Sequence, residues 1–490
     1  MASPQSTPSE NVQLTTVPLI INGQDVYTPE GFDIVSPGTG ERVWTCCSVT
    51  RRATDNAVAA ASRAFATWSA TKPAFRRAIF LRAAAILEQR ATEGQEYMAE
   101  ETGATQPFLL VNTDSATELL RDLAGRINRA LSGQVPVCEE QDTHALVLRE
   151  PYGVVLGIAP WNAPFILGIR AVAYALAAGN TCVLKGSEFS PRCFWLIGSI
   201  FREAGLPDGC LNVIYHRPEA AAEITTALIE HSAVRKVNFT GSTAVGRIIS
   251  AMAGRNLKPV LMELGGKSSA IVCEDADLDL AAQECAVGAF LHSGQICMST
   301  ERILVYHTVM HRFTESLKAA ISTFFGPEGM PQTVVQQTAV ARNRHLIEDA
   351  VSKGATIIYG NHTDDKVSTL SPFQLHPTVV QAVAPNMDLY QMESFGPTVS
   401  LIAVESDEQA IAISNDTEYG LSGAVFTRNL AKGLTLAKRI QTGAVHINSM
   451  SVHDEAGLPH GGFKGSGWGR FNADAGLEEF LQIKTITFKQ

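Results

Sequence analysis

Short apolar runs alternate with helical patterns through the middle of the chain. The apolar runs fall at 154–158, 181–184, 211–214 and 236–239, and apolar residues recur at helical spacing over about 166–178, 192–204 and 220–230. Continuous apolar strands that alternate with helices are typical of βαβ units, in which a parallel sheet is buried on both faces. The pattern predicts an α/β fold that binds ligands beyond the carboxyl ends of its strands.

The alternation resumes after residue 265 and predicts a second α/β unit. Its expected strands lie at 269–272, 302–306, 356–359, 399–404 and 443–447. A helix is expected at about 278–291, because Asp277 is a suitable N-cap and apolar residues follow at helical spacing. This helix leads into the segment that contains Cys297.

The ends of the chain carry other patterns. A hairpin is expected around Asn22-Gly23, and helices at about 54–70, 73–102 and 114–131, with Thr54 as an N-cap and Pro73 in a first turn. Residues 481–488 alternate as an edge strand does, and an extended arm at 134–150 of another subunit could cover that strand.

These patterns divide the chain into four parts. The expected parts are a flexible tail at 1–17, a first α/β domain at 18–132 and 151–265, a second at 266–470, and an oligomerisation arm at 133–150 and 471–490. A length of 490 residues agrees with more than one domain, because single cores rarely exceed ~250–300 residues.

The net charge and the cysteine content limit the binding partners and the cellular compartment that we expect for this chain. The net charge of −10 gives no reason to expect nucleic acid or an acidic membrane surface, and no apolar run approaches the ~18 residues of a membrane helix. The first residues lack the apolar core of a signal peptide. Nine cysteines without zinc-type spacing predict reduced thiols in the cytosol and no metal site.

Cys297 and Glu263 are the strongest candidates for chemistry. Cys297 follows the expected helix and a glycine-containing turn, and Glu263 precedes Gly265-Gly266. A thiol and a carboxylate beside glycines, which allow a ligand to approach closely, are typical of covalent catalysis with a separate general base. The alternative is a buried structural thiol, the interpretation that we keep for the other eight cysteines, including Cys273 and Cys285.

Polar residues and glycines follow three of the expected strands. Asn162 can donate a hydrogen bond at the ligand edge of the sheet or simply occupy a turn. Lys185 and Glu188 can bind ribose hydroxyls or face solvent. The glycine-rich segment 240–246 can bind a pyrophosphate at a helix N-terminus, although it lacks the standard dinucleotide fingerprint.

Five motifs together identify a family. They are Pro160-Trp161-Asn162, Gly241-Ser242-Thr243, Glu263-Leu264-Gly265-Gly266-Lys267, Gly294-Gln295-Ile296-Cys297 and Glu393-Ser394-Phe395-Gly396-Pro397. In this order they resemble the NAD(P)-dependent aldehyde dehydrogenase superfamily. The resemblance implies a Rossmann-like cofactor domain formed by the first α/β domain, a catalytic domain formed by the second, and a small β arm that assembles a homodimer or homotetramer.

The resemblance also implies roles for single residues. Cys297 would attack the aldehyde carbonyl, with Asn162 and the Cys297 backbone N–H as the oxyanion hole, and Glu263 would activate the water that hydrolyses the thioester. Members that pass the acyl group to coenzyme A lack this glutamate, so water is the expected acceptor. The residues expected at the cofactor are Trp161, Lys185, Glu188, Gly241, Ser242, Gly246, Leu264, Glu393 and Phe395.

The cofactor expected from this set is NAD, with NADP possible. Lys185 and Glu188 would hold the adenine ribose, Ser242 the pyrophosphate, and Glu393 the nicotinamide ribose beside Phe395. A carboxylate that grips both ribose hydroxyls would repel a 2′-phosphate, which favours NAD over NADP.

The expected substrate is an aromatic aldehyde. Resemblance to salicylaldehyde, vanillin and benzaldehyde dehydrogenases is clearest over 292–300, 447–455 and 469–471. Ile296 and Met298 would form an apolar slot for a flat ring. Arg170 lies about two helical turns after Asn162, so it either contacts a polar ring substituent or extends from the helix into solvent. His292 is expected to be a turn residue rather than a base.

Two alternatives stay open at this point. The same chemistry can act on an aliphatic aldehyde or semialdehyde, and the scaffold can serve as a non-catalytic structural protein. A panel of substrates separates the first alternative. The second is disfavoured because the nucleophile and the base are both present.

Overall fold

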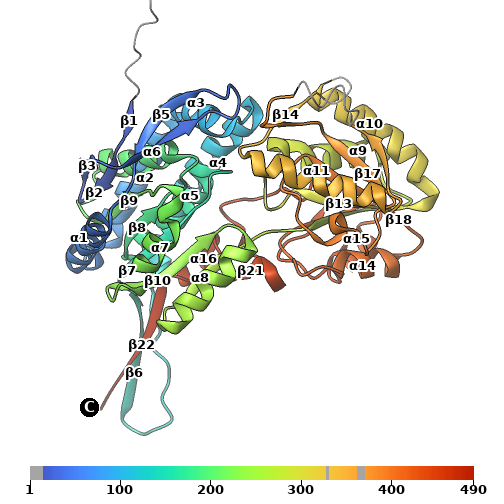
Figure 1. Ribbon diagram of the computed structural model, residues 1–490. Helices are drawn as coiled ribbons and strands as arrows, with labels where there is room; N and C mark the ends of the chain where they lie inside the picture. Colours follow the sequence, from blue (N-terminus) through green and yellow to red (C-terminus); the bar gives the residue numbers. More distant parts are fainter. Residues whose placement is uncertain (1–14, 327–329, 361–369, 490) are drawn as a thin grey trace, which may run out of the picture.

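The computed structural model describes residues 15–326, 330–360 and 370–489 and confirms the predicted α/β fold. Two sheets with helices packed against them form the two halves of the body (Figure 1). The first sheet has the order β21-β11-β10-β7-β8-β9-β2-β3, and its central strands are parallel. These central strands are β7 Val154–Ile158, β8 Thr181–Lys185, β9 Leu211–Ile214, β10 Val234–Thr240 and β11 Val260–Glu263. At the edge of this sheet, β2 Leu19–Ile21 and β3 Gln24–Val26 form the expected hairpin.

The second sheet has the order β15-β17-β18-β13-β12-β19-β20, with only β15 antiparallel to its neighbour among the described strands. Its strands are β12 Ser268–Val272, β13 Thr300–Tyr306, β15 Thr356–Tyr359, β17 Thr378–Gln381, β18 Thr398–Val404, β19 Gly423–Phe426 and β20 His446–Ile447. The sequence pattern does not predict β17 or β19. The strand expected at 443–447 forms only at its last two residues.

Among the described residues of the first half, the structure has eight α-helices where the apolar pattern predicts six, because the helix expected over 73–102 is divided in two and the pattern does not predict the helix over 243–255. Those of the first half are α1 Arg51–Ser69, α2 Pro73–Gln89, α3 Ala91–Thr102, α4 Gln106–Ala130, α5 Pro164–Ala178, α6 Pro191–Glu203, α7 Ala221–Glu230 and α8 Thr243–Arg255. Thr50, not Thr54, is the N-cap of α1, because the Thr50 side chain accepts a backbone hydrogen bond of the first turn and Thr54 is buried inside the helix. The helix expected over 73–102 is broken at Arg90, whose φ and ψ are −99° and 15°.

In the second half, α9 begins at the predicted N-cap. Its helices include α9 Leu278–Phe290, α10 Met310–Phe325, α11 Gln337–Ser352, α14 Asp407–Asn415 and α15 Leu430–Ala437. Apolar residues of the sheet pack against α9 and α10 on one face and against α11, α14 and α15 on the other. The amino ends of β12, β13 and β18 face the first half of the body, because Gly265, Cys297 and Phe395, which precede these strands, line one cavity with residues of the first half.

Three segments depart from the expected division of the chain. Thr16–Val17 form β1 beside β5 Arg42–Cys47 rather than part of a tail, and residues 1–14 lie outside the described residues. Gly467–Trp468 form β21, which returns to the first sheet. Residues 471–480 contain α16 Ala473–Glu478, which packs against α4 and α5 instead of joining the arm.

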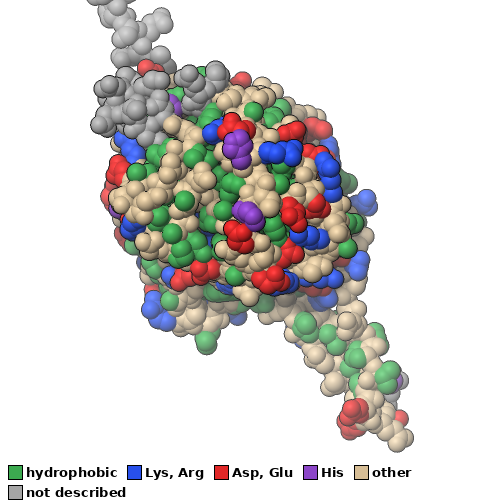
Figure 2. Space-filling model, turned by 90° about the vertical axis from the view of Figure 1, so that its right-hand side faces the viewer, with side chains coloured by type: hydrophobic (Ala, Val, Ile, Leu, Met, Phe, Trp, Pro, Cys, Tyr) green, Lys and Arg blue, Asp and Glu red, His purple; other side chains and the backbone are tan. Residues whose placement is uncertain are grey.

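The arm is a two-stranded ribbon within one chain. β6 Thr143–Pro151 pairs antiparallel with β22 Leu481–Lys489 along the whole of both strands. The expectation that another subunit's arm pairs with this edge of β22 is therefore wrong, because the chain's own arm already occupies it. Figure 2 shows the ribbon projecting from the body with hydrophobic side chains on its surface.

Over the described ranges, the helices are too short or too polar to cross a membrane.

Candidate active site

The loop that carries Cys297 is built at the end of α9. The Asp277 side chain caps this helix by accepting a backbone hydrogen bond of the first turn, as predicted. After the helix, His292 and Ser293 adopt left-handed angles, with φ of 48° and 58°. His292 is buried and stacks on Phe108 with ring centroids 4.5 Å apart, and burial lowers its pKa to about 3. It is a neutral turn residue, as expected, and the turn directs Cys297 into a cavity.

Cys297, Glu263 and Asn162 open onto one cavity of about 440 Å³. Asn162 follows β7, and its Nδ2 donates a hydrogen bond to the Gln295 carbonyl oxygen 2.9 Å away, which ties the amide to the nucleophile loop. Glu263 is the last residue of β11 and is 1% exposed. Neither of its carboxylate oxygens has a hydrogen-bond partner among the described residues. The fold thus brings together three groups that lie far apart in the sequence.

Burial and neighbouring charges set the protonation of these groups. Burial, followed by the nearby Glu263 carboxylate, raises the pKa of the Cys297 thiol well above its ordinary value. Burial alone would raise the pKa of Glu263, but contacts with His460, and then with Cys297 and Arg170, lower it overall. At neutral pH the site therefore holds a protonated thiol beside an ionised carboxylate.

The same cavity extends along the carboxyl edge of the first sheet. Its lining there includes Trp161, Lys185, Glu188, Gly241, Ser242, Leu264, Glu393 and Phe395. Ser242 is the N-cap of α8, so the amides at this helix N-terminus lie at the cavity. Gly246 lies one turn further on, beneath the cavity, where a Cβ would come within 2.6 Å of the Leu264 side chain. The arrangement fits an extended ligand with negative charge opposite Ser242.

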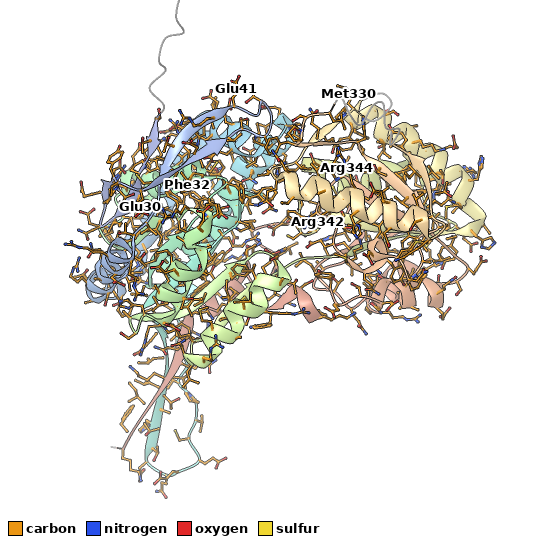
Figure 3. All side chains as sticks on the ribbon, in the orientation of Figure 1. Glu30, Phe32, Glu41, Met330, Arg342 and Arg344 are labelled. Carbon is orange, nitrogen blue, oxygen red and sulfur yellow. The ribbon has the colours of Figure 1, made fainter. Side chains whose placement is uncertain are left out.

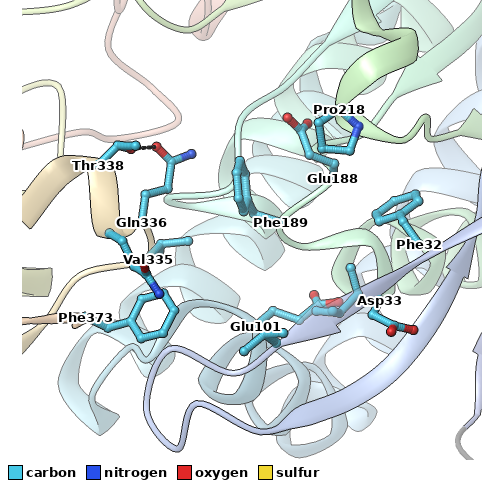
Figure 4. A pocket seen from close by; sticks show the side chains of 13 residues that line it. Phe32, Asp33, Glu101, Glu188, Phe189, Pro218, Val335, Gln336, Thr338 and Phe373 are labelled. Atoms are coloured by element: carbon cyan, nitrogen blue, oxygen red, sulfur yellow. Dashed lines mark hydrogen bonds between the residues drawn. The ribbon is translucent and has the colours of Figure 1, made fainter. Parts of the chain in front are cut away.

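The far end of this cavity carries a Lys–Glu pair. Lys185 Nζ lies 3.7 Å from Glu188 Oε2. Glu188 and Phe189 also line a neighbouring cavity of about 450 Å³, which Figure 4 shows together with Phe32 and Glu101. Its lining among the described residues does not include Cys297, so this second cavity lies outside the chemistry.

A buried ion pair that the motifs did not reveal supports Glu393. Lys267 Nζ lies 2.7 Å from Glu301 Oε2, with both side chains almost fully buried. Glu301 accepts hydrogen bonds from Ser394 N at 2.9 Å and Ser394 Oγ at 2.8 Å. The Ser394 carbonyl accepts a further one from Arg342 of α11, labelled in Figure 3. Burial raises the pKa of Glu393 to about 8.

A smaller cavity of about 200 Å³ adjoins the first and shares Asn162 and Cys297 with it. Ile296, Met298 and Arg170 line it, as the sequence led us to expect. Val452, His453 and Asp454, from the stretch 447–455 that carries the resemblance, also line it. The lining further includes Phe108, Val111 and Ser115, to which the sequence pattern assigned no role, and His460, which the sequence did not single out.

Arg170 is 2% exposed, so the alternative of a solvent-facing arginine is wrong. Its Nη2 pairs with Asp454 Oδ2, and its guanidinium lies 5.6 Å from the centre of the Phe471 ring. Asp454 belongs to the segment that precedes β21, so the pair depends on the return of the chain to the first sheet. The charge of Arg170 is thereby compensated inside the cavity.

Seven of the other eight cysteines are buried, as the structural interpretation requires, whereas Cys138, on the arm, is only half-buried. The half-buried thiol of Cys297 stands out by its position, at the junction of an elongated polar cleft and a small apolar pocket. Together with a carboxylate and an amide on an α/β scaffold, it defines the class of thiol-dependent enzymes that act on a carbonyl beside a dinucleotide-type cleft.

The chain belongs to the aldehyde dehydrogenase family, whose sequence profile matches residues 25–486. This confirms the predicted family and the prediction of an oxidoreductase. A vanillin dehydrogenase of Pseudomonas fluorescens is 43% identical over 480 residues, covering 96% of this chain and 98% of the relative. A crystal structure of a salicylaldehyde dehydrogenase from Pseudomonas putida G7, complexed with salicylaldehyde, has a TM-score of 0.92 and 34% identity, covering 97% and 98% of the two chains.

A second similar structure was solved with a cofactor. It is a betaine aldehyde dehydrogenase from Staphylococcus aureus in complex with NAD+, with a TM-score of 0.90 and 29% identity. The similarity covers 96% of this chain and 94% of that one. The NAD in that structure belongs to that protein.

Proposed function

We propose that this protein oxidises an aromatic aldehyde to the carboxylic acid, with NAD as hydride acceptor and water as acyl acceptor. The observation that carries the proposal is the single cavity onto which the Cys297 thiol, the Asn162 amide and the Glu263 carboxylate open. The cleft on one side suits a dinucleotide, and the small pocket on the other suits an aldehyde.

Cys297, Asn162 and Glu263 each carry out a different part of the reaction. Cys297 Sγ, as thiolate, attacks the carbonyl carbon, while Asn162 Nδ2 and the Cys297 backbone N–H donate hydrogen bonds to the oxyanion; each such donor is worth ~10²–10³ in rate. NAD, held in the cleft beside Glu393 and Phe395, would supply the hydride acceptor, and the Cys297 sulfur would then carry the acyl group as a thioester. Glu263 then takes a proton from water as the water oxygen attacks the thioester carbon. The C–S bond breaks, and the acid leaves the regenerated thiolate.

The cleft residues fit NAD. Lys185 and Glu188 lie where an adenine ribose would be held, and the N-terminus of α8 at Ser242 suits a pyrophosphate. Glu393 and Phe395 line the same cavity as Cys297, and we assign them to the nicotinamide ribose and ring. The Glu188 carboxylate disfavours a 2′-phosphate, so we expect NAD to be preferred to NADP.

The small pocket favours an aromatic aldehyde over a semialdehyde. Ile296 and Met298 give it apolar walls beside the thiol. A semialdehyde with a second carboxylate needs an unpaired cation, whereas Arg170 is compensated by Asp454 and no other Lys or Arg occurs in the described lining. The Arg170–Asp454 pair can instead meet a hydroxyl or methoxy group on the ring. The vanillin and salicylaldehyde dehydrogenases among the relatives support this choice.

We further infer a cytosolic homodimer or homotetramer assembled through the arm. Free thiols at all nine cysteines agree with a reducing compartment. The two-stranded ribbon of β6 and β22 would be only marginally stable in water without a further contact, which another copy of the chain can supply.

A panel of aldehydes tests the proposal. With NAD, we expect benzaldehyde and its hydroxylated and methoxylated forms to be oxidised with higher kcat/KM than aliphatic aldehydes and semialdehydes. Cys297→Ser should abolish NADH formation, and Arg170→Ala should change the ratio between hydroxylated and plain benzaldehydes. NADH formation that survives in Cys297→Ser would overturn the mechanism; a preference for aliphatic aldehydes would overturn the substrate class; an unchanged ratio would exclude the role of Arg170.

A further inference from the structure

A buried polar cluster lies behind Glu263, and the chemistry above does not use its histidine, His460. His460 Nε2 lies 3.7 Å from Glu263 Oε1, and His460 Nδ1 lies 3.9 Å from Asp454 Oδ1. Asp454 also pairs with Arg170 and accepts a hydrogen bond from Asn472 Nδ2 at 2.7 Å. The order Glu263, His460, Asp454 places an imidazole between two carboxylates.

The backbone holds His460 in this position. β21 pairs antiparallel with β11, with Gly467 opposite Glu263, so the segment before β21 returns to the end of β11. His460 and Phe471 exchange backbone hydrogen bonds of 2.9 Å and 2.7 Å across this loop. Main-chain pairing therefore fixes the backbone of His460 near the end of β11, where its imidazole lies beside the Glu263 carboxylate.

Where the side chains of Glu263 and His460 meet, polar atoms lack hydrogen-bond partners among the described residues. Asp454 has Arg170 and Asn472 as partners, whereas His460 Nε2 and both oxygens of Glu263 have none within the described ranges. Buried polar atoms without partners are rare, and a functional site is one reason for them. With Nδ1–H turned toward Asp454, the ring would present the Nε2 lone pair to Glu263.

The charged and titratable groups around His460 come from several elements. They are Glu263 of β11, Asp454 of the loop before β21, Arg170 of α5, Cys297 of the nucleophile loop and His446 of β20. Arg170 compensates Asp454, so a positive imidazole would face the remaining carboxylate of Glu263. A proton on His460 is thus electrostatically tolerated.

We propose that His460 receives the proton that Glu263 takes from the hydrolytic water, with Asp454 orienting the ring. This rests on the proposed function. The water O–H bond breaks and its proton passes to Glu263 Oε1 as the new C–O bond forms and the C–S electron pair returns to sulfur. The proton then moves to His460 Nε2, which restores the Glu263 carboxylate. His460 acts through Glu263 and is a positioning and relay residue.

The burial of Glu263 explains why such an acceptor is needed. Its carboxylate is 1% exposed, so a proton left on it has no direct access to bulk water. His460 lines the small pocket together with His453, whose side chain is 36% exposed. The imidazole therefore lies between the buried base and the solvent side of the pocket.

The first test separates acylation from deacylation. NADH formed from benzaldehyde is followed by rapid mixing in the wild type, in His460→Ala and His460→Gln, and in His446→Ala as a matched control. Hydride transfer precedes the relay, so the His460 variants should release one NADH per active site at the wild-type rate. Their steady state should then fall by ~10²-fold, the lower end of a general acid–base contribution. His446→Ala should keep the wild-type steady state.

The second test is rescue, which a purely structural role would not permit. Added imidazole should raise the steady state of His460→Ala, increasingly so as the free imidazole loses its proton, and should leave His460→Gln and His446→Ala unchanged. Loss of the NADH burst in both His460 variants, a steady state equal to that of His446→Ala, or no rescue by imidazole would each overturn the relay. A wild type that forms no NADH from any aldehyde would overturn the proposed function itself.

Discussion

At the scale of single residues, the nucleophile starts in its unreactive form. Burial and the carboxylates of Glu263 and Glu393 raise the pKa of Cys297, so almost all of it is thiol at neutral pH. This protects a buried sulfur from oxidation, because the thiolate is the species that reacts. It also means that the site must lower the thiol pKa when the reactants are bound.

Alkylation measures this protonation state. In the cofactor-free enzyme, the rate at which iodoacetamide labels Cys297 should rise about tenfold per pH unit through neutral pH, because the thiol pKa lies above that range. Glu263→Gln removes the nearest negative charge and therefore lowers the thiol pKa, so labelling at neutral pH should become several-fold faster. Glu219→Gln, at an exposed position away from the cavity, is the control. Slower labelling of Glu263→Gln would contradict the assigned electrostatics.

The buried pair of Lys267 and Glu301 is a second residue-scale feature that can be measured. Lys267→Met leaves Glu301 charged and buried, which should lower the free energy of unfolding by ~3–5 kcal/mol. The cofactor site should weaken as well, since Glu301 holds the backbone at Ser394. Lys318→Met removes an exposed pair with Glu315 and should change stability by less than ~1 kcal/mol. Equal shifts of the two urea midpoints would contradict this assignment.

At the scale of elements, α8 contains two glycines with opposite surroundings. A Cβ at Gly246 would come within 2.6 Å of Leu264, which lines the cofactor cleft, whereas a Cβ at Gly254 meets nothing within 4 Å. Gly246→Ala should therefore displace Leu264, raise the KM for NAD and cost ~1–3 kcal/mol of stability. Gly254→Ala should leave kinetics unchanged and stabilise the helix by up to ~1 kcal/mol. Kinetics and thermal denaturation of the two variants check this, and matching KM values would contradict it.

The elements also show how far sequence reasoning reaches. Four of the five parallel strands of the first sheet and the cap at Asp277 follow from apolar runs and local signals, and the structure contains them. β11, β17 and β19 are four residues each, as are the predicted β9 and β15, so periodicity over so short a run identifies some strands and misses others. Glu301 and Arg302 lie in the fully buried β13, and charge in such a strand is a signal that could have indicated the ion pair of Glu301.

Local sequence patterns could not predict which side chains meet when they lie far apart in the chain. Arg170 and Asp454 are far apart in the chain and meet only because β21 returns to the first sheet. His460 reaches Glu263 for the same reason. The candidate nucleophile, base and amide could be chosen from the sequence because motifs mark them, whereas the residues behind them depend on tertiary pairing that no motif records.

At the scale of the whole molecule, the arm is the feature that the single chain leaves unexplained. Two strands alone are marginally stable in water, yet β6 and β22 pair along their whole length away from the body. Ile483 is 73% exposed on this ribbon, and Val137, in the segment before β6, is 99% exposed. An exposed apolar ribbon is stabilised when it packs against another copy, which is why we infer a homo-oligomer.

Sedimentation velocity tests the assembly. The wild type should sediment as a dimer or tetramer, and Ile483→Asp should shift it to smaller species at micromolar concentration, because a charge would be buried against the partner. Leu430→Asp places the same charge on an exposed apolar position at the start of α15, away from the arm, and should leave the assembly intact. The active-site residues come from the body alone, so smaller species of Ile483→Asp should retain the NADH burst while losing thermal stability. A monomeric wild type, or a Leu430→Asp variant that dissociates as readily as Ile483→Asp, would show that the arm does not hold the molecule together.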